Sequence, residues 1–146
     1  KFGVLARIAG LFSRRGFNIF SLAVAPTDDP SLSRISIVVD VHNTDAAQIA
    51  KQLDKLVNVL EITELQPVSS IERELMVARV EGTDSDAVRN FIDEVGGSVL
   101  DSNDRELIVS VHAHPNELDA CEAKLRKFGI LELQRTGRIA LGRLDS

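Results

Sequence analysis

The stretch from Gly3 to Ile19, which contains three glycines, constrains the fold more than any other feature of the sequence. Apolar residues at positions 4, 5, 8, 11 and 12 follow the spacing of an amphipathic helix, and the arginines of this stretch lie off that stripe. Gly16 stands where a left-handed residue would end the helix. The pattern therefore predicts a helix over 3–15 and then a strand, with Asn18 close to where the helix began. The result would be a polar notch beside a helix N-terminus, which suits a small zwitterion.

The remainder of the first half alternates between strand and helix patterns. The breaker-rich turn over 25–30 separates two strands, and the second strand alternates apolar and polar residues. The predicted order after the first helix is strand 17–25, strand 32–42, helix 45–57 and strand 58–66. Residues 67–71 are interpreted as a linker.

The second half repeats this plan and adds a strand in front of it. Its predicted elements are strand 72–81, helix 84–95, a hairpin of strands 98–101 and 105–113, helix 115–127 and strand 130–141. This order is the βαββαβ unit of the ferredoxin-like fold. The first half is the same unit without its first strand, so we expect about ten native N-terminal residues to be absent from the given chain. The predicted fold is α+β, with one ferredoxin-like domain over 1–66 and another over 72–146.

Bulk composition narrows the classes of function. The chain has 146 residues and a formal net charge of −5, whereas nucleic-acid binding demands a basic surface. Trp and Tyr are absent, so base-stacking side chains are few. No apolar run approaches the ~20 residues of a membrane helix, and nothing resembles a signal peptide. The single cysteine, Cys121, excludes an internal disulfide and fits a cytoplasmic location.

The residues that usually carry catalysis or bind metal do not form a convincing set. His112 and His114 share a strand face but lack a third ligand, and a structural zinc site needs four, so a surface pair is favoured. Cys121 lies on the apolar face of its helix. Glu72 and Glu74 are interpreted as part of a solvated face. No nucleophile elbow, phosphate loop or dinucleotide motif is present in the sequence, so neither a catalytic nor a metal-binding residue is predicted.

The stretch 3–19, followed by Ser21-Leu22-Ala23-Val24-Ala25-Pro26-Thr27, resembles the ACT domain of the acetolactate (acetohydroxyacid) synthase small subunit. Ile71-Glu72-Arg73-Glu74-Leu75 resembles the run that opens the second domain of that family. The stretch 136–143 resembles its closing strand. The resemblance spans nearly the whole chain and is weakest between about 82 and 130.

The resemblance implies a regulatory subunit that has no catalytic activity by itself. Its partner would be a large subunit that condenses two 2-oxoacids and holds thiamine diphosphate, Mg and FAD, while this chain would bind no cofactor. The small subunit raises that activity and confers feedback inhibition, usually by valine. In relatives the effector lies between the ACT domains of two protomers. The matching positions here are Gly3, the backbone of Val4 and Leu5, and Asn18.

Elementary chemistry supports an amino-acid effector at these positions. Unpaired N–H groups and the helix dipole attract a carboxylate to the first turn of the helix, and Gly3 lets the carboxylate approach. Asn18 offers both a donor and an acceptor. Leu5 and Ile19 could cover an aliphatic side chain. Relatives often carry Glu where this chain has Phe20, and a further effector residue would precede Lys1.

The sequence also predicts self-association. Strand 17–24 is apolar on both faces, with Phe17, Ile19 and Ala23 on one face and Phe20, Leu22 and Val24 on the other. One face would pack against its own helices and the other against a second copy, giving a homodimer through the ACT domains.

Two other classes of function stay open at this point. The first is a free-standing tandem ACT amino-acid sensor that acts on another partner. The second is a small enzyme on the same scaffold, since the fold alone does not exclude one. The sequence also leaves open whether valine, leucine or isoleucine is the preferred effector.

Overall fold

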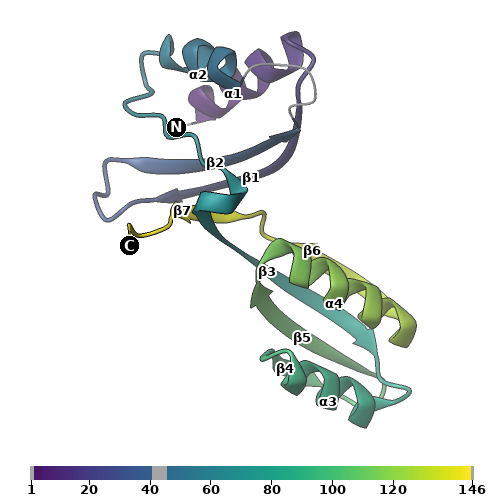
Figure 1. Cartoon of the computed structure of the whole chain (residues 1–146). Coiled ribbons are helices and arrows are strands. Elements are labelled where there is room, and N and C mark those ends of the chain that lie inside the picture. The colour runs from purple at the N-terminus through teal and green to yellow at the C-terminus, as the bar shows by residue number, and fades with distance from the viewer. Residues whose placement is uncertain (1, 41–45, 146) are drawn as a thin grey trace. The chain divides into compact units, whose positions relative to one another are not determined.

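The computed structural model describes residues 2–40 and 46–145 of the chain. Contacts divide the chain into Lys1–Ser69 and Ser70–Ser146, called unit 1 and unit 2 below. In each unit, helices cover one face of an antiparallel sheet and bury a separate hydrophobic core (Figure 1). The predicted α+β fold class is confirmed.

Unit 1 is a β-hairpin covered by two helices. Its elements are α1 (Phe2–Arg14), β1 (Asn18–Pro26), β2 (Ser33–Asp40) and α2 (Ala46–Asp54). α1 ends as predicted, because Gly16 takes a φ of 74° and the chain turns back at once. The tip of the hairpin is held by Asp29, whose carboxylate accepts hydrogen bonds from Ser31 Oγ (2.7 Å) and Ser31 N (3.0 Å). These bonds favour the ionised form and lower the pKa of Asp29.

The core of unit 1 joins both helices to the hairpin. Ile8, Phe12 and Ile49 are buried at its centre. Phe17 meets Phe12 edge to face, with ring centroids 6.3 Å apart. The partly buried residues around them are Val4, Phe17, Ile19, Ile35, Ile37, Val39, Leu53 and Leu56.

A β-bulge at Phe20 changes which residues of β1 share a face. Ile19 lies opposite Val39, and the register then shifts before Ser21, so that Leu22 lies opposite Ile37. Directly opposite residues project to the same side of a sheet. Leu22 therefore lies on the same face as Ile19, and the predicted alternation is wrong beyond the bulge.

Unit 2 is a complete βαββαβ fold with one additional strand. Its elements are β3 (Ser70–Glu81), α3 (Ser85–Glu94), β4 (Ser98–Ser102), β5 (Glu106–Ala113), α4 (Pro115–Phe128), β6 (Ile130–Arg135) and β7 (Ile139–Gly142). The sheet order is β4-β5-β3-β6, and β7 pairs with the first residues of β3. The predicted second ferredoxin-like domain is therefore present.

The core of unit 2 lies between the sheet and its two helices. Alternate residues of β3 and β5 project into it, and α3 and α4 close it with their apolar stripes. The buried members are Met76, Ala78, Val80, Val88, Phe91, Ile92, Leu107, Val109, Val111, Leu118, Cys121 and Leu125.

Several predicted boundaries differ from the structure, and the helix predicted over 45–57 ends at Asp54. The predicted strand 58–66 is absent. In unit 2 the last strand of the βαββαβ order, β6, pairs with the first strand, β3. The described part of unit 1 contains no equivalent of β3, so a strand at 58–66 would have no neighbour to pair with there. The expected strand 130–141 is two strands, because Gly137 turns the chain with a φ of 87°. β3 begins inside the expected linker, at Ser70, where it pairs with Gly142. The predicted strand end at 41–42 and helix start at 45 lie outside the described residues.

Candidate functional site

α1 carries the first group of predicted effector residues in its opening turn. Gly3 is exposed, and a Cβ built on it would meet nothing within 4 Å. Val4 and Leu5 follow in the same turn and are half-buried, with Val4 packed against the core of unit 1. The backbone N–H groups of a first turn lack partners within the helix and lie at its positive end. This turn can therefore hold a carboxylate, and its outer side is open.

β1 carries the second group at its start. Asn18 is the first residue of the strand and is exposed, so its amide is available to a ligand. Ile19 is half-buried, and its side chain packs against the core of unit 1. Ile19 is thus first a core residue, as the apolar pattern of the strand indicates.

The two groups lie at opposite ends of α1 within one chain. Phe17 N donates a hydrogen bond to Phe12 O (3.0 Å), which places the start of β1 beside the end of the helix. Gly3 and Arg14 are separated by 11 residues of helix, or about 16 Å at 1.5 Å per residue. The expected notch joining Asn18 to the start of the helix is wrong for a single chain, because a strand that follows a short turn begins where its helix ends.

Unit 2 contains a partly buried ion-pair network that the sequence interpretation missed. Arg135 forms a two-pronged salt bridge with Glu74, with Nε–Oε2 at 3.1 Å and Nη2–Oε1 at 3.2 Å. It also contacts Asp119 at 2.7 Å and Glu122 at 3.4 Å, both on α4. Burial opposes the charged guanidinium, but these carboxylates outweigh it and raise the pKa of Arg135. The network ties α4 to the sheet.

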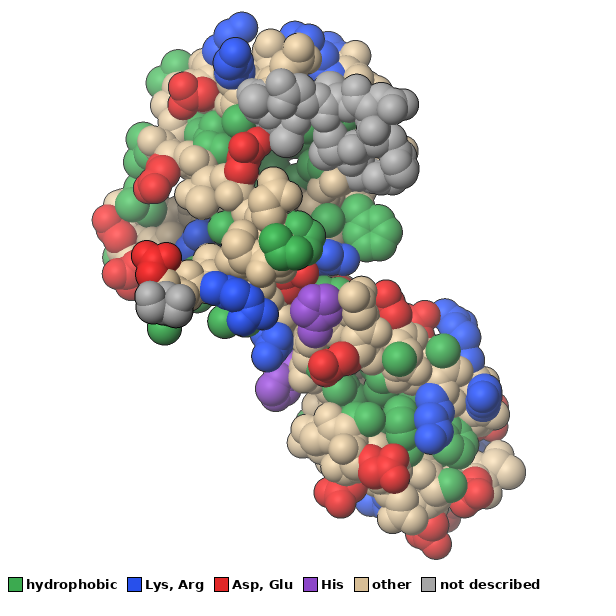
Figure 2. Space-filling model, viewed as in Figure 1, with side chains coloured by type: hydrophobic (Ala, Val, Ile, Leu, Met, Phe, Trp, Pro, Cys, Tyr) green, Lys and Arg blue, Asp and Glu red, His purple; other side chains and the backbone are tan. Residues whose placement is uncertain are grey.

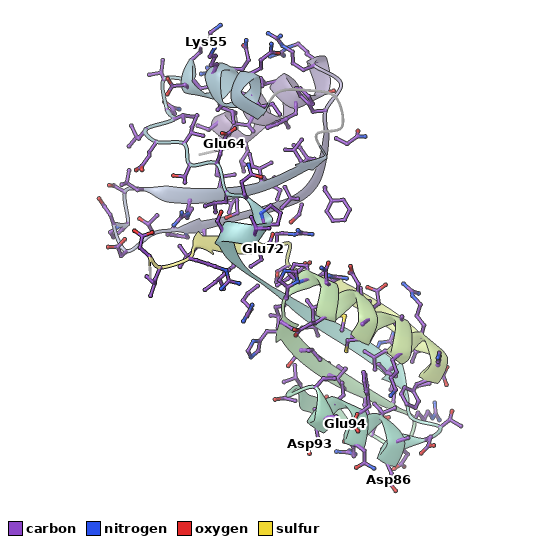
Figure 3. All side chains as sticks on the ribbon, viewed as in Figure 1. Lys55, Glu64, Glu72, Asp86, Asp93 and Glu94 are labelled. Carbon is purple, nitrogen blue, oxygen red and sulfur yellow. The ribbon has the colours of Figure 1, made fainter. Side chains whose placement is uncertain are left out.

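Glu72 and Glu74 are therefore not a solvated face, as the sequence suggested. The side chain of Glu74 is 9% exposed and that of Glu72 13% exposed. Glu72, labelled in Figure 3, pairs with Arg138 (3.2 Å) and with His114 Nε2 (3.2 Å). The signal available in the sequence was their phase: Glu72 and Glu74 alternate in step with Met76, Ala78 and Val80, the residues of β3 that project into the core. Both carboxylates therefore lie on the side of the sheet that the helices cover.

His114 serves as a helix cap. Its Nδ1 accepts a hydrogen bond from Asn116 N (3.1 Å) at the start of α4, so Nε2 carries a ring proton and lies 3.2 Å from Glu72 Oε2. His112 is exposed. Across residues 2–40 and 46–145 there is no group of three or more His, Cys, Asp or Glu side chains that could hold a metal ion.

Cys121 is buried in the core of unit 2, as its helical position predicted. Burial raises the pKa of its thiol. Such a thiol packs as a small hydrophobic group and is a poor nucleophile at neutral pH. No helix among the described residues is long and apolar enough to cross a membrane.

A shallow, open depression of about 360 Å³ lies on the face of the unit 2 sheet that faces away from α3 and α4. Its charged centre, Arg79, is already paired with Glu106 (3.1 Å) and Glu132 (3.4 Å). The depression therefore offers less to an amino-acid ligand than the first turn of α1. The lining residues are Leu75, Val77, Arg79, Ile108, Glu132, Gln134, Arg135 and Thr136.

Comparison with known proteins assigns both units. Residues 1–61 match the family model described as "AHAS small subunit-like ACT domain", and residues 73–144 match "Small subunit of acetolactate synthase". The acetolactate synthase isozyme 3 small subunit of Escherichia coli K12 is 40% identical over 146 residues, covering 98% of this chain and 90% of that protein. The acetolactate synthase small subunit of Mycolicibacterium smegmatis is 38% identical over 143 residues, covering 97% and 84%.

A solved structure agrees with these matches. The crystal structure of the acetolactate synthase small subunit from Thermotoga maritima superposes with a TM-score of 0.92 and 31% identity, over 100% of this chain and 92% of that chain. Fold and matches together define a protein with two tandem ferredoxin-like units, of which the first is an ACT domain. Both family models and all of these relatives point to one family. The chain belongs to the acetolactate synthase small subunits.

Proposed function

We propose that this chain activates the catalytic large subunit of acetolactate synthase and confers on it feedback inhibition by valine. Family membership over both units supports the large subunit as its partner. The large subunit would carry thiamine diphosphate, Mg and FAD and perform the condensation. This chain would bind only the effector and would contribute no catalytic residue.

The observation that carries the effector site is the position of Gly3 and Asn18 at opposite ends of α1. A separation of about 16 Å is far longer than one valine, so one chain cannot present both residues to the same molecule. In a symmetric dimer, the start of α1 of one protomer can meet the start of β1 of the other, and two equivalent sites result. The carboxylate would bind the first turn of α1, and Asn18 of the partner subunit would bind the amino group.

The surface of β1 suits such a dimer. Among the described residues β1 pairs only with β2, so it lies at the edge of a two-stranded sheet. Three of its large apolar side chains are unusually exposed: Phe20 at 73%, Leu22 at 40% and Val24 at 46%. Exposed apolar side chains on an edge strand favour burial against another chain.

Control of the large subunit would follow from a population shift. Valine would stabilise one arrangement of the dimer, and the catalytic subunit would prefer the other. A coupling free energy of about 1–3 kcal/mol is sufficient for inhibition of about 5- to 150-fold. Leu5, half-buried beside the first turn, would limit the pocket to a small aliphatic side chain.

Mixed dimers test the shared site directly. Gly3→Asp and Asn18→Ala homodimers should each lose valine binding, because every site contains one altered residue. A dimer with one chain of each kind has one site with both native residues and one with neither. Valine binding by isothermal calorimetry should return in the mixed dimer with about half the wild-type stoichiometry. No recovery would show that the two residues do not form one site across the dimer.

The alternative, a tandem ACT sensor acting on another partner, shares this site. It is disfavoured because residues 73–144 also match the acetolactate synthase family. A pull-down from the native host that recovers a transporter or regulator, and no thiamine-diphosphate enzyme, would favour it.

A further inference from the structure

The outward sides of α1 and α2, together with the residue that follows each helix, carry a group of cations that form no salt bridge with a described residue. Blue side chains project from the side of unit 1 where Figure 1 draws these helices (Figure 2). Lys55, labelled in Figure 3, points away from the hairpin. The group consists of Arg7, Arg14, Arg15, Lys51 and Lys55, all exposed, and is called the basic helical face below.

The two helices offer these cations few carboxylates. α1 contains no acidic residue, and Asp54 is the only one on the described length of α2. None of the five forms a salt bridge with any residue in 2–40 or 46–145. In unit 2, Arg79, Arg126 and Arg135 form salt bridges with carboxylates. The exposed cations of unit 2 that form none with a described residue include Arg105, Lys127 and Arg143. Unpaired cations on one face of a chain with a net charge of −5 represent a marked segregation of charge.

Helix capping explains part of this arrangement only. A cation in the last turn interacts well with the helix dipole, and Arg14 and Lys51 occupy such positions. Arg7 lies in the middle of α1, where the helix dipole does not stabilise a cation. The side chain of Arg14 lies over Gly10, one turn earlier in the helix: a Cβ built on Gly10 would be 3.3 Å from Arg14 Nη1. The guanidinium therefore faces outward and not toward the core.

We propose that the basic helical face docks onto an acidic surface of the catalytic large subunit. This inference rests on the proposed function, because that function supplies the partner. An acidic protein surface matches the face in charge, and the acidic remainder of the chain would repel it in any other orientation. A nucleic acid is a poorer match, since the chain has no Trp or Tyr and a net negative charge.

The position of the face also links docking to the effector. α1 holds Gly3 at its first turn and Arg7 and Arg14 along its outer side. A shift of this one helix on binding valine would move the docking cations with it. The two sites would therefore be coupled through a single rigid element.

Charge reversal with a matched control tests the proposal. The test variant is Arg7→Glu/Arg14→Glu/Lys51→Glu. The control is Arg105→Glu/Lys127→Glu/Arg143→Glu, which changes the net charge equally at exposed cations of unit 2 that form no salt bridge with a described residue. The measured quantity is the concentration of each chain that gives half-maximal activation of the cognate large subunit, at about 50 mM and about 300 mM salt.

The concentration of wild-type chain that gives half-maximal activation should rise several-fold between low and high salt. For the test variant this concentration should be about tenfold higher than for the wild type at low salt, and it should change little with added salt. The control should stay within about twofold of the wild type. Far-UV circular dichroism checks the fold, and the neutral Arg7→Gln/Arg14→Gln/Lys51→Gln variant should show a smaller shift in the same direction.

Three outcomes would overturn the proposal, and they are distinguishable. If the wild type activates and the test variant matches the control, the basic helical face does not dock and the proposed function stands. If the wild type neither binds nor activates the large subunit, the proposed function fails and the docking proposal fails with it. If the wild type binds double-stranded DNA at physiological salt and the test variant does not, the face binds nucleic acid.

Discussion

Gly3→Asp should weaken valine inhibition while leaving the fold and the activation intact. A carboxylate on residue 3 would compete with the carboxylate of valine for the N–H groups of the first turn. At about 4 Å the repulsion between two such charges is about 1 kcal/mol in bulk water and about 4 kcal/mol at an effective dielectric constant of 20. The valine inhibition constant should therefore rise between about 5-fold and about 1,000-fold.

The fold should tolerate this change. A Cβ at Gly3 meets no atom within 4 Å, and its φ is not in the left-handed region, so neither a clash nor backbone strain arises. Aspartate has a better helix propensity than glycine by about 0.3 kcal/mol. A negative charge in the first turn adds about 0.3–1 kcal/mol through the helix dipole.

The assay is acetolactate formation by the cognate large subunit, saturated with the variant, across a valine titration. Ala9→Asp is the matched control, because it adds the same charge at an exposed position of α1 away from the first turn. The control should keep the wild-type inhibition constant. An unchanged inhibition constant in Gly3→Asp would remove the first turn of α1 from the effector site.

Three further predictions concern unit 2. Arg135→Leu should lower the free energy of unfolding of unit 2 by about 2–4 kcal/mol, because Glu74 would keep a nearly buried charge without a partner. The loss is measured as reduced protection of the β5 amides from hydrogen exchange, and unchanged protection would contradict the prediction. Gly97→Ala should lower the free energy of unfolding by about 1–3 kcal/mol in the same measurement, because the new Cβ would lie 2.6 Å from Ser110 O, a backbone atom that cannot easily move. The thiol of Cys121 should react with a disulfide reagent at pH 8 only as fast as unit 2 opens, and rapid reaction in the native state would show that this part of the core is not closed.

The sequence predicted the helices well because their signals are local and redundant. In α1 the apolar spacing, the off-stripe arginines and the terminal Gly16 all indicate the same helix. In α4, Pro115 at the start and Gly129 at the end do the same. The βαββαβ order of unit 2 then followed from the order of these elements.

The errors concern features that depend on partners distant in the sequence. A strand needs a neighbour, and the stretch 59–66 has none in the described part of unit 1. A bulge needs a register, so the extra residue at Phe20 is invisible to an alternation pattern. The partner of Glu74 is Arg135, 61 residues away, and no local rule pairs them.

The residues of the candidate site stay a prediction from the sequence, and their arrangement could not be predicted from it. The sequence singles out Gly3 and Asn18 as candidates, but their separation along α1 follows from the turn at Gly16, which places the strand at the far end of the helix. That separation is also the reason why a second chain enters the proposal.

Acetolactate formation by the cognate large subunit, with and without this chain and across a valine titration, tests the central claim most directly. The chain should raise the rate several-fold, and valine should reverse the rise. If a large subunit that responds to its own small subunit shows no change in rate, the chain is not its activator. Activation that valine leaves unchanged would contradict the effector site at Gly3 and Asn18.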